Sequence, residues 1–431
     1  MKSIFVFRRD LRVEDNTALN QALKQSEVLP CFIFDPRQVK DNEYKSERAV
    51  QFMVDSLEDL GEQLKRAGGK LHYFHGKPEE VVRELDYDAV FVNMDYTPFS
   101  MKRDSAIKKA CEEQGKKFFS FHDSLLNPPG TIKNGKGEPY QVFTYYHKKA
   151  RELEVREPET VKGKFLKEDC EEPFSLEKGD IRGGREKALE ILAGIQRLED
   201  YEKTHDLPSK KTSMLSPHNK FGTVSIREAY HSVSRELGEK HPLLRQLHWR
   251  DFFTQLAWSW PKVFGHAFKK KYDSLPWEND EDKFDAWRKG LTGFPIVDAG
   301  MRELKTGFMH NRVRMIVGSF LVKDLHIDWR WGEKYFARML VDYDPCVNNG
   351  NWQWVASTGA DAQPYFRIFN PWSQQKRFDP DCEYIKTWVE ELSGLSPKEI
   401  HGLEHERVEE YPKPMVDHKK ESSKAKQSYK L

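Results

Sequence analysis

Residues 3–16 read SIFVFRRDLRVEDN, an apolar run with the character of a buried strand that charged residues end at once. Four more apolar runs follow at 28–34, 70–75, 88–94 and 117–122, and stretches with helical periodicity separate them. The clearest of these stretches, residues 46–69, has apolar residues three and four apart and stops at a Gly-Gly pair. This alternation predicts an α/β domain over residues 1–126, with a doubly wound parallel sheet of Rossmann-like layout.

The residues after the first strand distinguish this domain from a dinucleotide-binding one. A dinucleotide-binding fold has G-x-G-x-x-G at this place, because glycines let the backbone approach a pyrophosphate. This chain has RRDLRVEDN instead. The sequence therefore predicts the layout of the fold without its usual phosphate cradle.

The chain changes character after the first domain. Residues 127–186 are rich in Pro, Gly and charged residues, and we interpret them as a long interdomain linker. Helical periodicity dominates residues 187–410, which predicts an all-helical second domain. Residues 411–431 form a basic, Ser-rich end that we expect to be a frayed tail. The fold class is thus α/β plus all-α.

Composition limits the classes of protein to consider. A chain of 431 residues is too long for one core, and its net charge of +1 does not by itself indicate a nucleic-acid partner. No apolar run approaches the roughly 18 residues of a membrane span, and the N-terminus lacks the pattern of a secretory signal. The five cysteines are scattered singly, which is typical of reduced thiols and predicts no metal site. We expect a cytoplasmic protein.

The aromatic load lies in the second part of the chain. All eleven tryptophans occur at or after Trp249, and residues 348–371, NNGNWQWVASTGADAQPYFRIFNP, are almost free of charge. Trp277, Trp329 and Trp352 lie in three separate segments. Large cores use tryptophan, so packing is one interpretation. A site that stacks flat rings or passes electrons between them is the other.

Two polar segments are candidate sites. The turn TSMLS (212–216) precedes a helix, where hydroxyls and backbone N–H groups suit a phosphate, although an ordinary helix cap uses the same residues. HNRVRM (310–315) places Asn311 and Met315 on one helical face, beside Arg314. Arg314 is expected to pair with Asp342 and Asp344, either as a structural ion pair or as a frame around a polar ring system.

A local surplus of basic residues also marks the helical part. Its members are Lys269, Lys270, Lys271, Arg302, Lys305, Arg312, Lys323 and Arg330. A solvated face is one interpretation, and a footprint on a phosphate backbone is the other.

Long ordered segments resemble the DNA photolyase/cryptochrome family across almost the whole chain. They are RRDLRVEDN, PPG…YQVFTYY, WRDFF (249–253), LTGFPIVDAGMREL (291–304), MHNRVRM (309–315), FLVKDLHIDWRWGEKYF (320–336) and NNGNWQW…YFRIFNPWSQ (348–374). In detail the chain is most similar to class I photolyases that repair cyclobutane pyrimidine dimers (CPDs).

The resemblance implies an FAD bound by the helical domain and active as anionic FADH⁻. By motif position, the residues implied to bind its phosphates are Tyr201 and the turn Thr212, Ser213, Met214, Leu215 and Ser216. Met214 replaces an Arg that is common in the family. The residues implied to surround the isoalloxazine ring and the adenine-ribose part of FAD are Arg250, Asn311, Arg314, Asp342, Asp344 and Asn348. Of these, Asn348 is implied to face flavin N5.

The implied activity is light-driven repair, a carbon-carbon lyase reaction. The excited reduced flavin donates an electron to a dimer flipped out of DNA, and Trp352, Trp329 and Trp277 match the family's electron chain to the surface. The lesion-side positions are Gln246, Trp249, Asn311, Arg312, Met315 and Trp354. No general base or nucleophile is needed, since the cofactor carries the chemistry. The resemblance implies a monomer that binds dimer-containing DNA and no membrane.

Three rivals and two further departures bear on this interpretation. One rival is a redox-silent flavoprotein or plain DNA-binding protein, which would have no use for the tryptophan chain. A (6-4) photolyase has histidines at the positions of Asn311 and Met315, and a signalling cryptochrome often has a long C-terminal extension. Gln246 stands where CPD photolyases usually have Glu. An antenna chromophore is possible, and deazaflavin or flavin is favoured over folate. Phe99 and Ser100 replace the Asn-Glu of folate-binding members, whereas Asp35, Arg48 and Asp95 resemble the lining of a deazaflavin or flavin pocket.

Overall fold

The chain forms two units in the computed structural model, which describes residues 1–40, 42–166, 182–361 and 367–430. Unit 1 comprises residues 1–199, 213–261 and 341–346, and unit 2 comprises 200–212, 262–340 and 347–431. Several helices that follow the predicted linker therefore group with the sheet. The predicted domain boundaries stay a prediction, and linker residues 167–181 lie outside the described residues.

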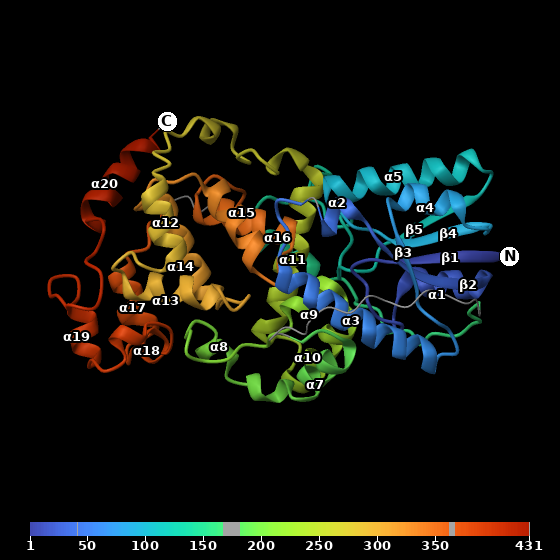
Figure 1. Cartoon of the computed structure of the whole chain (residues 1–431), viewed down its shortest axis with the longest axis horizontal. Coiled ribbons are helices and arrows are strands. Elements are labelled where there is room, and N and C mark those ends of the chain that lie inside the picture. Colours follow the sequence, from blue (N-terminus) through green and yellow to red (C-terminus); the bar gives the residue numbers. More distant parts are fainter. Residues whose placement is uncertain (41, 167–181, 362–366, 431) are drawn as a thin grey trace. The chain divides into compact units, whose positions relative to one another are not determined.

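A parallel sheet forms the first part of unit 1, as the sequence predicted (Figure 1). Its strands are β1 (Lys2–Phe7), β2 (Glu27–Phe34), β3 (His72–His75), β4 (Ala89–Asn93) and β5 (Lys117–Phe121). Their order is β3-β2-β1-β4-β5, so the chain starts in the middle and winds outward in both directions. This is the doubly wound topology.

Helices cover both faces of the sheet because the strand side chains alternate between two apolar faces. Phe5 and Phe7 pack with α1 (Thr17–Gln25) and α3 (Glu47–Arg66), whereas Ile4 and Val6 pack toward α4 (Pro78–Glu84) and α5 (Pro98–Glu113). The short α2 (Pro36–Val39) follows β2. Asn16, the last residue of the opening stretch, caps α1 by accepting from the N–H of Leu19.

Further helices complete unit 1. They are α6 (Phe143–Ala150), α7 (Arg185–Ala193), α9 (Ser216–Phe221), α10 (Ile226–Leu237) and α11 (Pro242–Ser259). The start of α10 is fixed by a capping box between Ser225 and Glu228.

Unit 2 contains helices and no strand in its described residues, as predicted for this region. They are α8 (Tyr201–Thr204), α12 (Glu281–Lys289), α13 (Pro295–Leu304), α14 (Asn311–Lys323), α15 (Trp329–Met339), α16 (Pro345–Val355, in this unit from Val347), α17 (Pro371–Phe378), α18 (Glu383–Trp388), α19 (Pro397–Gly402) and α20 (His418–Ser428). Aromatic rings fill the core, with Phe320 and Trp372 at 4.7 and 4.9 Å from Phe294. None of the described helices has the length and apolar character needed to cross a membrane.

The expected frayed tail is wrong, because residues 418–428 form helix α20. Asp417 caps the helix, and Ala425 is buried. His418 lies 2.5 Å from Asp324, His326 lies 2.9 Å from Glu421, and the Tyr429 hydroxyl donates to the carbonyl of Ala356 at 2.7 Å. The many lysines made the composition resemble that of a solvated tail. In the structure these lysines face outward, and the few side chains that anchor the helix are spread among them.

Candidate functional site

The charged residues that follow β1 form a buried ion network in unit 1. Arg12 donates to Asp123 at 2.6 Å, and Arg227 of α10 donates to both Asp123 and Asp15 at 2.8 and 2.7 Å. Burial alone would raise the pKa of Asp123, but Arg12 and Arg227 outweigh it and hold the pKa below its usual range. Paired guanidinium and carboxylate groups thus take the place where a dinucleotide fold has glycines.

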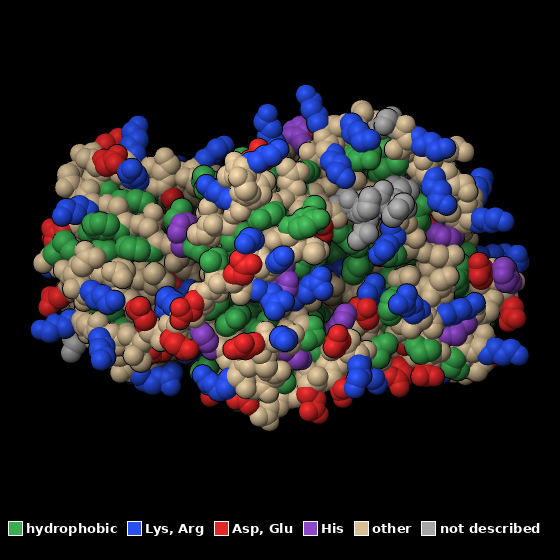
Figure 2. All heavy atoms as spheres, turned by 180° about the vertical axis from the view of Figure 1, so that it is seen from behind, with side chains coloured by type: hydrophobic (Ala, Val, Ile, Leu, Met, Phe, Trp, Pro, Cys, Tyr) green, Lys and Arg blue, Asp and Glu red, His purple; other side chains and the backbone are tan. Residues whose placement is uncertain are grey.

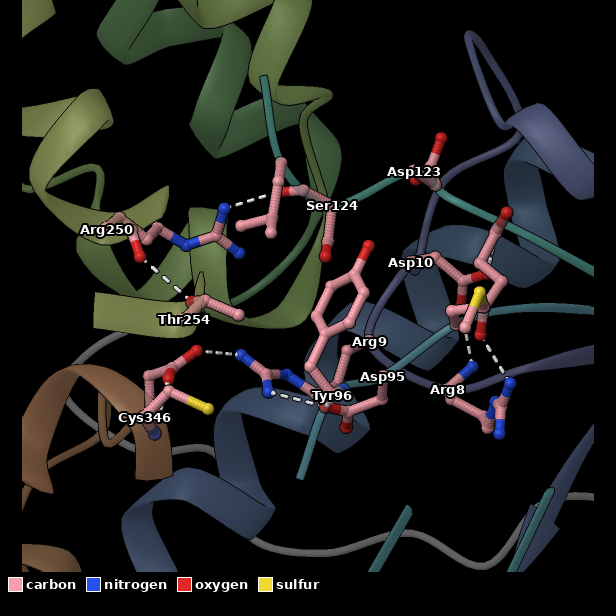
Figure 3. A pocket seen from close by; sticks show the side chains of 14 residues that line it. Arg8, Arg9, Asp10, Asp95, Tyr96, Asp123, Ser124, Arg250, Thr254 and Cys346 are labelled. Carbon is pink, nitrogen blue, oxygen red and sulfur yellow. Dashed lines mark hydrogen bonds and ion pairs between the residues drawn. The ribbon is translucent and has the colours of Figure 1, made fainter. Parts of the chain in front are cut away.

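A cavity lies beside this network at the carboxyl ends of β1, β4 and β5 (Figure 3). Arg9 ion-pairs with Asp95 and with Asp344, and Tyr96, Arg250 and Cys346 also line the space. The Arg250 guanidinium donates to the carbonyls of Ser124 and Asn219. Two predicted FAD residues, Arg250 and Asp344, therefore line one cavity. Carboxyl ends of parallel strands are the usual place for ligands in such sheets.

The predicted phosphate turn has a backbone suited to an anion. Met214 has a φ of 59°, and Leu215 follows with right-handed helical angles. Two successive residues of opposite hand point their N–H groups into a small concavity that binds anions. The N-cap residue Leu215 makes no side-chain cap bond, but the Ser213 hydroxyl accepts from the N–H of Leu215 at 3.4 Å, so the phosphate turn stays a prediction beside the local Ser/Thr interpretation. A left-handed non-glycine residue is strained, which is common at ligand sites. These residues of unit 1 fit a pyrophosphate.

Carboxylates proposed for an antenna site already have partners. Asp35 accepts from the guanidinium of Arg37, whose Cζ lies 5.5 Å from the ring centre of Phe99. Asp95 accepts from Ser100 at 3.0 Å as well as from Arg9. The antenna assignment stays a prediction.

The two residues of α11 that are predicted to face the lesion differ in exposure. Gln246 is exposed, whereas Trp249 is half-buried and stacks on Phe143 with ring centres 3.5 Å apart. The N-terminal part of this helix thus presents an amide to solvent beside a rigidly held aromatic ring. This arrangement suits a flat ligand.

The three tryptophans of the predicted electron chain all lie in unit 2. Trp352 and Trp329 are buried, and Trp277 is half-buried. Trp352 packs edge-on to Phe336 at 4.9 Å, and Gly332 of α15 allows this close approach. Within the described part of the chain, the indole N–H groups of Trp329 and Trp277 are buried and have no acceptor.

Asn348 is held by a network of neutral amides in the same unit. Its side-chain NH₂ donates to the backbone carbonyl of Glu333 at 3.2 Å. The neighbouring Asn349 donates to the Glu333 carboxyl at 3.1 Å and to the carbonyl of Val263 at 3.0 Å. Gln353 in turn donates to Asn349 at 3.0 Å. Burial raises the pKa of Glu333 to about 7.

Residues 310–315 behave partly as predicted. Asn311 lies within 3.8 Å of the sulfur of Met315, so the two share a face. Arg314 donates to the carbonyl of Met309 at 2.8 Å, and its predicted pairing with Asp342 and Asp344 stays a prediction. Arg312 forms an ion pair with Asp206 at 2.6 Å.

Other predicted positions can be placed individually. Tyr201 starts α8 and is buried, which raises its pKa to about 12. Asp342 is half-buried and belongs to the short 341–346 segment of unit 1.

The burial of Lys323 beside a second cavity removes this residue from the predicted basic surface. Trp354 lines this cavity together with Ser319, Lys323, Ser357, Arg367 and Phe369. Lys323 is buried and donates to Ser357 at 2.9 Å, and burial lowers its pKa to about 7. It is therefore not a surface cation, whereas Lys269, Lys270 and Lys271 are exposed. In Figure 2, Lys and Arg side chains stand along the upper edge of the part that holds α12 to α20.

Sequence reasoning missed Glu333, Asn349, Gln353 and the polar side of the Trp354 cavity. Asn349 and Gln353 are four residues apart, as are Asn348 and Trp352, so helical spacing was the available signal. Nothing in the local sequence indicated that Glu333 of another helix would meet them.

Comparisons with known proteins agree along the chain. Residues 3–162 match the family model described as DNA photolyase, and residues 243–431 match the model for the FAD binding domain of DNA photolyase. A deoxyribodipyrimidine photo-lyase from Alkalihalophilus pseudofirmus is 37% identical over 471 residues, covering 98% of this chain and 97% of that protein.

Solved structures give the same answer. The structure of an archaeal photolyase from Sulfolobus tokodaii with two FAD molecules is 45% identical, with a TM-score of 0.91 and full coverage of both chains. A cryptochrome from Synechocystis sp. is 28% identical, with a TM-score of 0.90 and 99% coverage of each chain.

Proposed function

The chain belongs to the DNA photolyase family, and on that premise we propose that it repairs cyclobutane pyrimidine dimers in DNA with light. The observation that carries the proposal is the match of nearly the whole chain to deoxyribodipyrimidine photo-lyases. The enzyme class is a carbon-carbon lyase. The lineage most similar in its motifs is class I.

The cofactor of this domain family is FAD. When bound, FAD supplies light absorption and the electron that splits the dimer. The left-handed turn at Met214 and the half-buried hydroxyls of Thr212 and Ser213 would hold its phosphates. Arg250, Asp344 and Arg314 would surround its more distal parts. No other group of the chain has to act as acid, base or nucleophile.

Asn348 would orient the reactive ring. Because its NH₂ group donates to the carbonyl of Glu333, its Oδ1 is directed away from that bond and is ready to accept. An acceptor of this kind favours the protonated, reduced ring. Met315 and Asn311 lie on one helical face where a (6-4) enzyme has histidines, which supports the CPD lesion over the (6-4) lesion.

The lesion would be held by aromatic walls and positioned by local cations. A dimer must leave the duplex to reach a buried cofactor, and photolyases belong to the enzymes that extrude their target base from the stack. Trp249 and Trp354 offer flat surfaces, where stacking contributes about 1–3 kcal/mol per base. The exposed lysines 269–271 and Arg312 would contact phosphates, so binding should weaken as salt rises.

A second chromophore is part of the proposal. The Sulfolobus tokodaii photolyase has two FAD molecules, and its structure concerns a light-harvesting cofactor. We therefore favour a flavin as antenna in this chain, near Asp35, Arg48 and Asp95. We further propose that the protein acts as a monomer in the cytoplasm.

The deciding experiment is a repair assay with reduced protein and DNA that contains a single thymine dimer. Repair that needs light, and restores thymines from CPD but not from (6-4) lesions, is expected. Lesion binding without any repair in light would favour a cryptochrome photoreceptor instead.

The tryptophan chain has its own test. Trp352→Phe should abolish photoreduction of oxidised flavin, because it removes the first of the three predicted carriers. Repair by chemically pre-reduced protein should be spared. Loss of repair in the pre-reduced variant would mean that Trp352 shapes the lesion site instead.

A further inference from the structure

Glu333 contacts two successive amides of α16 through different groups. Its backbone carbonyl accepts from Asn348 at 3.2 Å, and its carboxyl accepts from Asn349 at 3.1 Å. The carboxyl is almost fully buried. One residue of α15 therefore ties α16 at two points, directly beside the position that faces the flavin in the proposed function.

The rest of the network fixes which way each amide points. Gln353 accepts from the N–H of Phe268 at 2.7 Å, so its NH₂ group must face the carbonyls of Val263 and His266 and the oxygen of Asn349. Asn349 accepts from Gln353 and must therefore donate toward Glu333 and Val263. Every amide has one consistent orientation, because an NH₂ group only donates and an amide oxygen only accepts.

We propose that Glu333 is a positioning residue that presents the Asn348 oxygen, and not its NH₂ group, to the flavin. The carboxyl bond to Asn349 fixes the rotation of α16 about its axis. That rotation keeps the Asn348 NH₂ group within reach of the Glu333 carbonyl. Without the carboxyl anchor, Asn348 can flip and set a donor against the N–H of the reduced ring.

The charge state of Glu333 is consistent with this role. Burial raises its pKa to about 7, so much of it is neutral at neutral pH. A neutral carboxyl keeps an oxygen that accepts from Asn349 without placing a full negative charge near an electron-rich ring. The inference rests on the proposed contact between Asn348 and the flavin.

The test compares midpoint reduction potentials of the FAD-loaded protein and its variants by redox titration. Glu333→Leu should make the flavin harder to reduce by about fivefold in the equilibrium constant, the worth of one ordinary hydrogen bond. Glu333→Gln should keep the parent potential, since its amide oxygen still accepts from Asn349. An unchanged potential in Glu333→Leu overturns the proposal.

A matched control separates positioning from general stability. Asp379 is another buried carboxylate of unit 2, and it accepts from the N–H groups of Tyr384 and Ile385. Asp379→Asn should lower the melting temperature and leave the potential unchanged. A shift as large as that of Glu333→Leu would show that any loosening of the unit moves the potential, and would overturn the assigned role.

Two further variants keep the outcomes distinct. Asn349→Ala breaks the same bond from the other side, so it should reproduce the shift in potential. The two substitutions combined should shift the potential no further than either one alone. If Glu333→Leu does not retain flavin, Asn349→Ala still tests the bond. Asn348→Ala tests the proposed flavin contact itself. If Asn348→Ala shifts the potential but neither Glu333→Leu nor Asn349→Ala does, only the positioning role fails. If Asn348→Ala leaves it unchanged, the flavin contact fails first.

Discussion

Two buried networks, one in unit 1 and one in unit 2, hold their polar groups in opposite ways. At the sheet edge of unit 1, the side chains of Arg12, Asp123 and Arg227 are buried as ions, and each has an opposite charge within 2.8 Å. Around Asn348 in unit 2, the buried groups are amides and one carboxyl whose pKa rises to about 7. A buried charge is tolerated where an opposite charge pairs with it. A buried carboxylate without such a partner takes up a proton and becomes neutral.

This difference matches what each region does. The ion network ties the loop after β1 to α10, and its strength lies in geometry that never has to change. The amide network lies beside residues proposed to contact a redox cofactor. A full charge at this place would shift the reduction potential of the cofactor. Neutral groups can orient a ring without doing so.

The largest expected effect is in the ion network. Asp123→Asn takes the carboxylate away from buried Arg12 and leaves Arg227 with Asp15 as its remaining carboxylate partner, so it should destabilise the protein by about 3–5 kcal/mol. Thermal melting and denaturant titration measure the loss. The matched control is Glu113→Gln, which breaks the exposed pair with Arg83 and should change little. Equal effects of both variants would show that burial does not matter here.

The sequence predicted the parts of this comparison unequally. The order of strands and helices follows from hydrophobic periodicity, because each element has to bury its own apolar face. The partners of RRDLRVED (8–15) did not follow, since Asp123, which pairs with Arg12, and Arg227, which pairs with Asp15, lie more than a hundred residues further along the chain. The family motifs indicated Asn348 and the tryptophans. The supporting Glu333 carries no local signal, and neither does the burial of Lys323, which looked like a surface cation.

The second prediction concerns pH. As the pH changes, the contributions of Glu333 and Asp123 to folding stability change in opposite directions. The folded protein keeps the Glu333 proton up to about pH 7, while the unfolded chain loses it near the usual 4.5. Stability from this group is therefore lost as pH rises from 4.5 to 7, by up to about 3 kcal/mol at 1.36 kcal/mol per pKa unit. For Asp123, whose pKa is lowered, stabilisation is present above the ordinary carboxyl pKa and disappears only as the pH falls into strong acid.

Melting temperatures of parent, Glu333→Gln and Asp123→Asn between pH 4 and 8 measure both signs. The advantage of Glu333→Gln over the parent should grow from pH 5 to 7. The deficit of Asp123→Asn should stay constant across this range. A parallel pH course for the two variants contradicts the assignment of one network as ionic and the other as neutral.

A smaller effect is expected from the contact between α15 and α16. A Cβ added at Gly332 would lie 2.2 Å from Cη2 of Trp352 and 2.6 Å from Leu321. Overpacking of this kind costs about 1–3 kcal/mol, which exceeds or cancels the roughly 0.5–1 kcal/mol that Ala gains over Gly in a helix. Gly332→Ala should therefore lower stability and slow flavin photoreduction by displacing Trp352. Gly394→Ala is the control, because nothing lies within 4 Å of its added Cβ.

The smallest expected effect tests whether a group that can transfer a proton is useful at Gln246, the exposed residue of α11 that is predicted to face the lesion. Gln246 is exposed on this helix, and the resemblance to CPD photolyases implies a position where those enzymes usually have Glu. A carboxyl that can carry a proton beside the lesion should stabilise negative charge on the dimer better than an amide, which donates a hydrogen bond but transfers no proton easily. Gln246→Glu should raise the yield of restored thymines per absorbed photon, at saturating lesion and with fully reduced flavin in both proteins. Gln246→Ala is the matched control and should lower the yield, since it can neither donate nor transfer. If Gln246→Glu repairs no better than the parent, the surroundings of Gln246 are tuned to the amide, and neutral polar groups are then the rule on the lesion side as well as around Asn348.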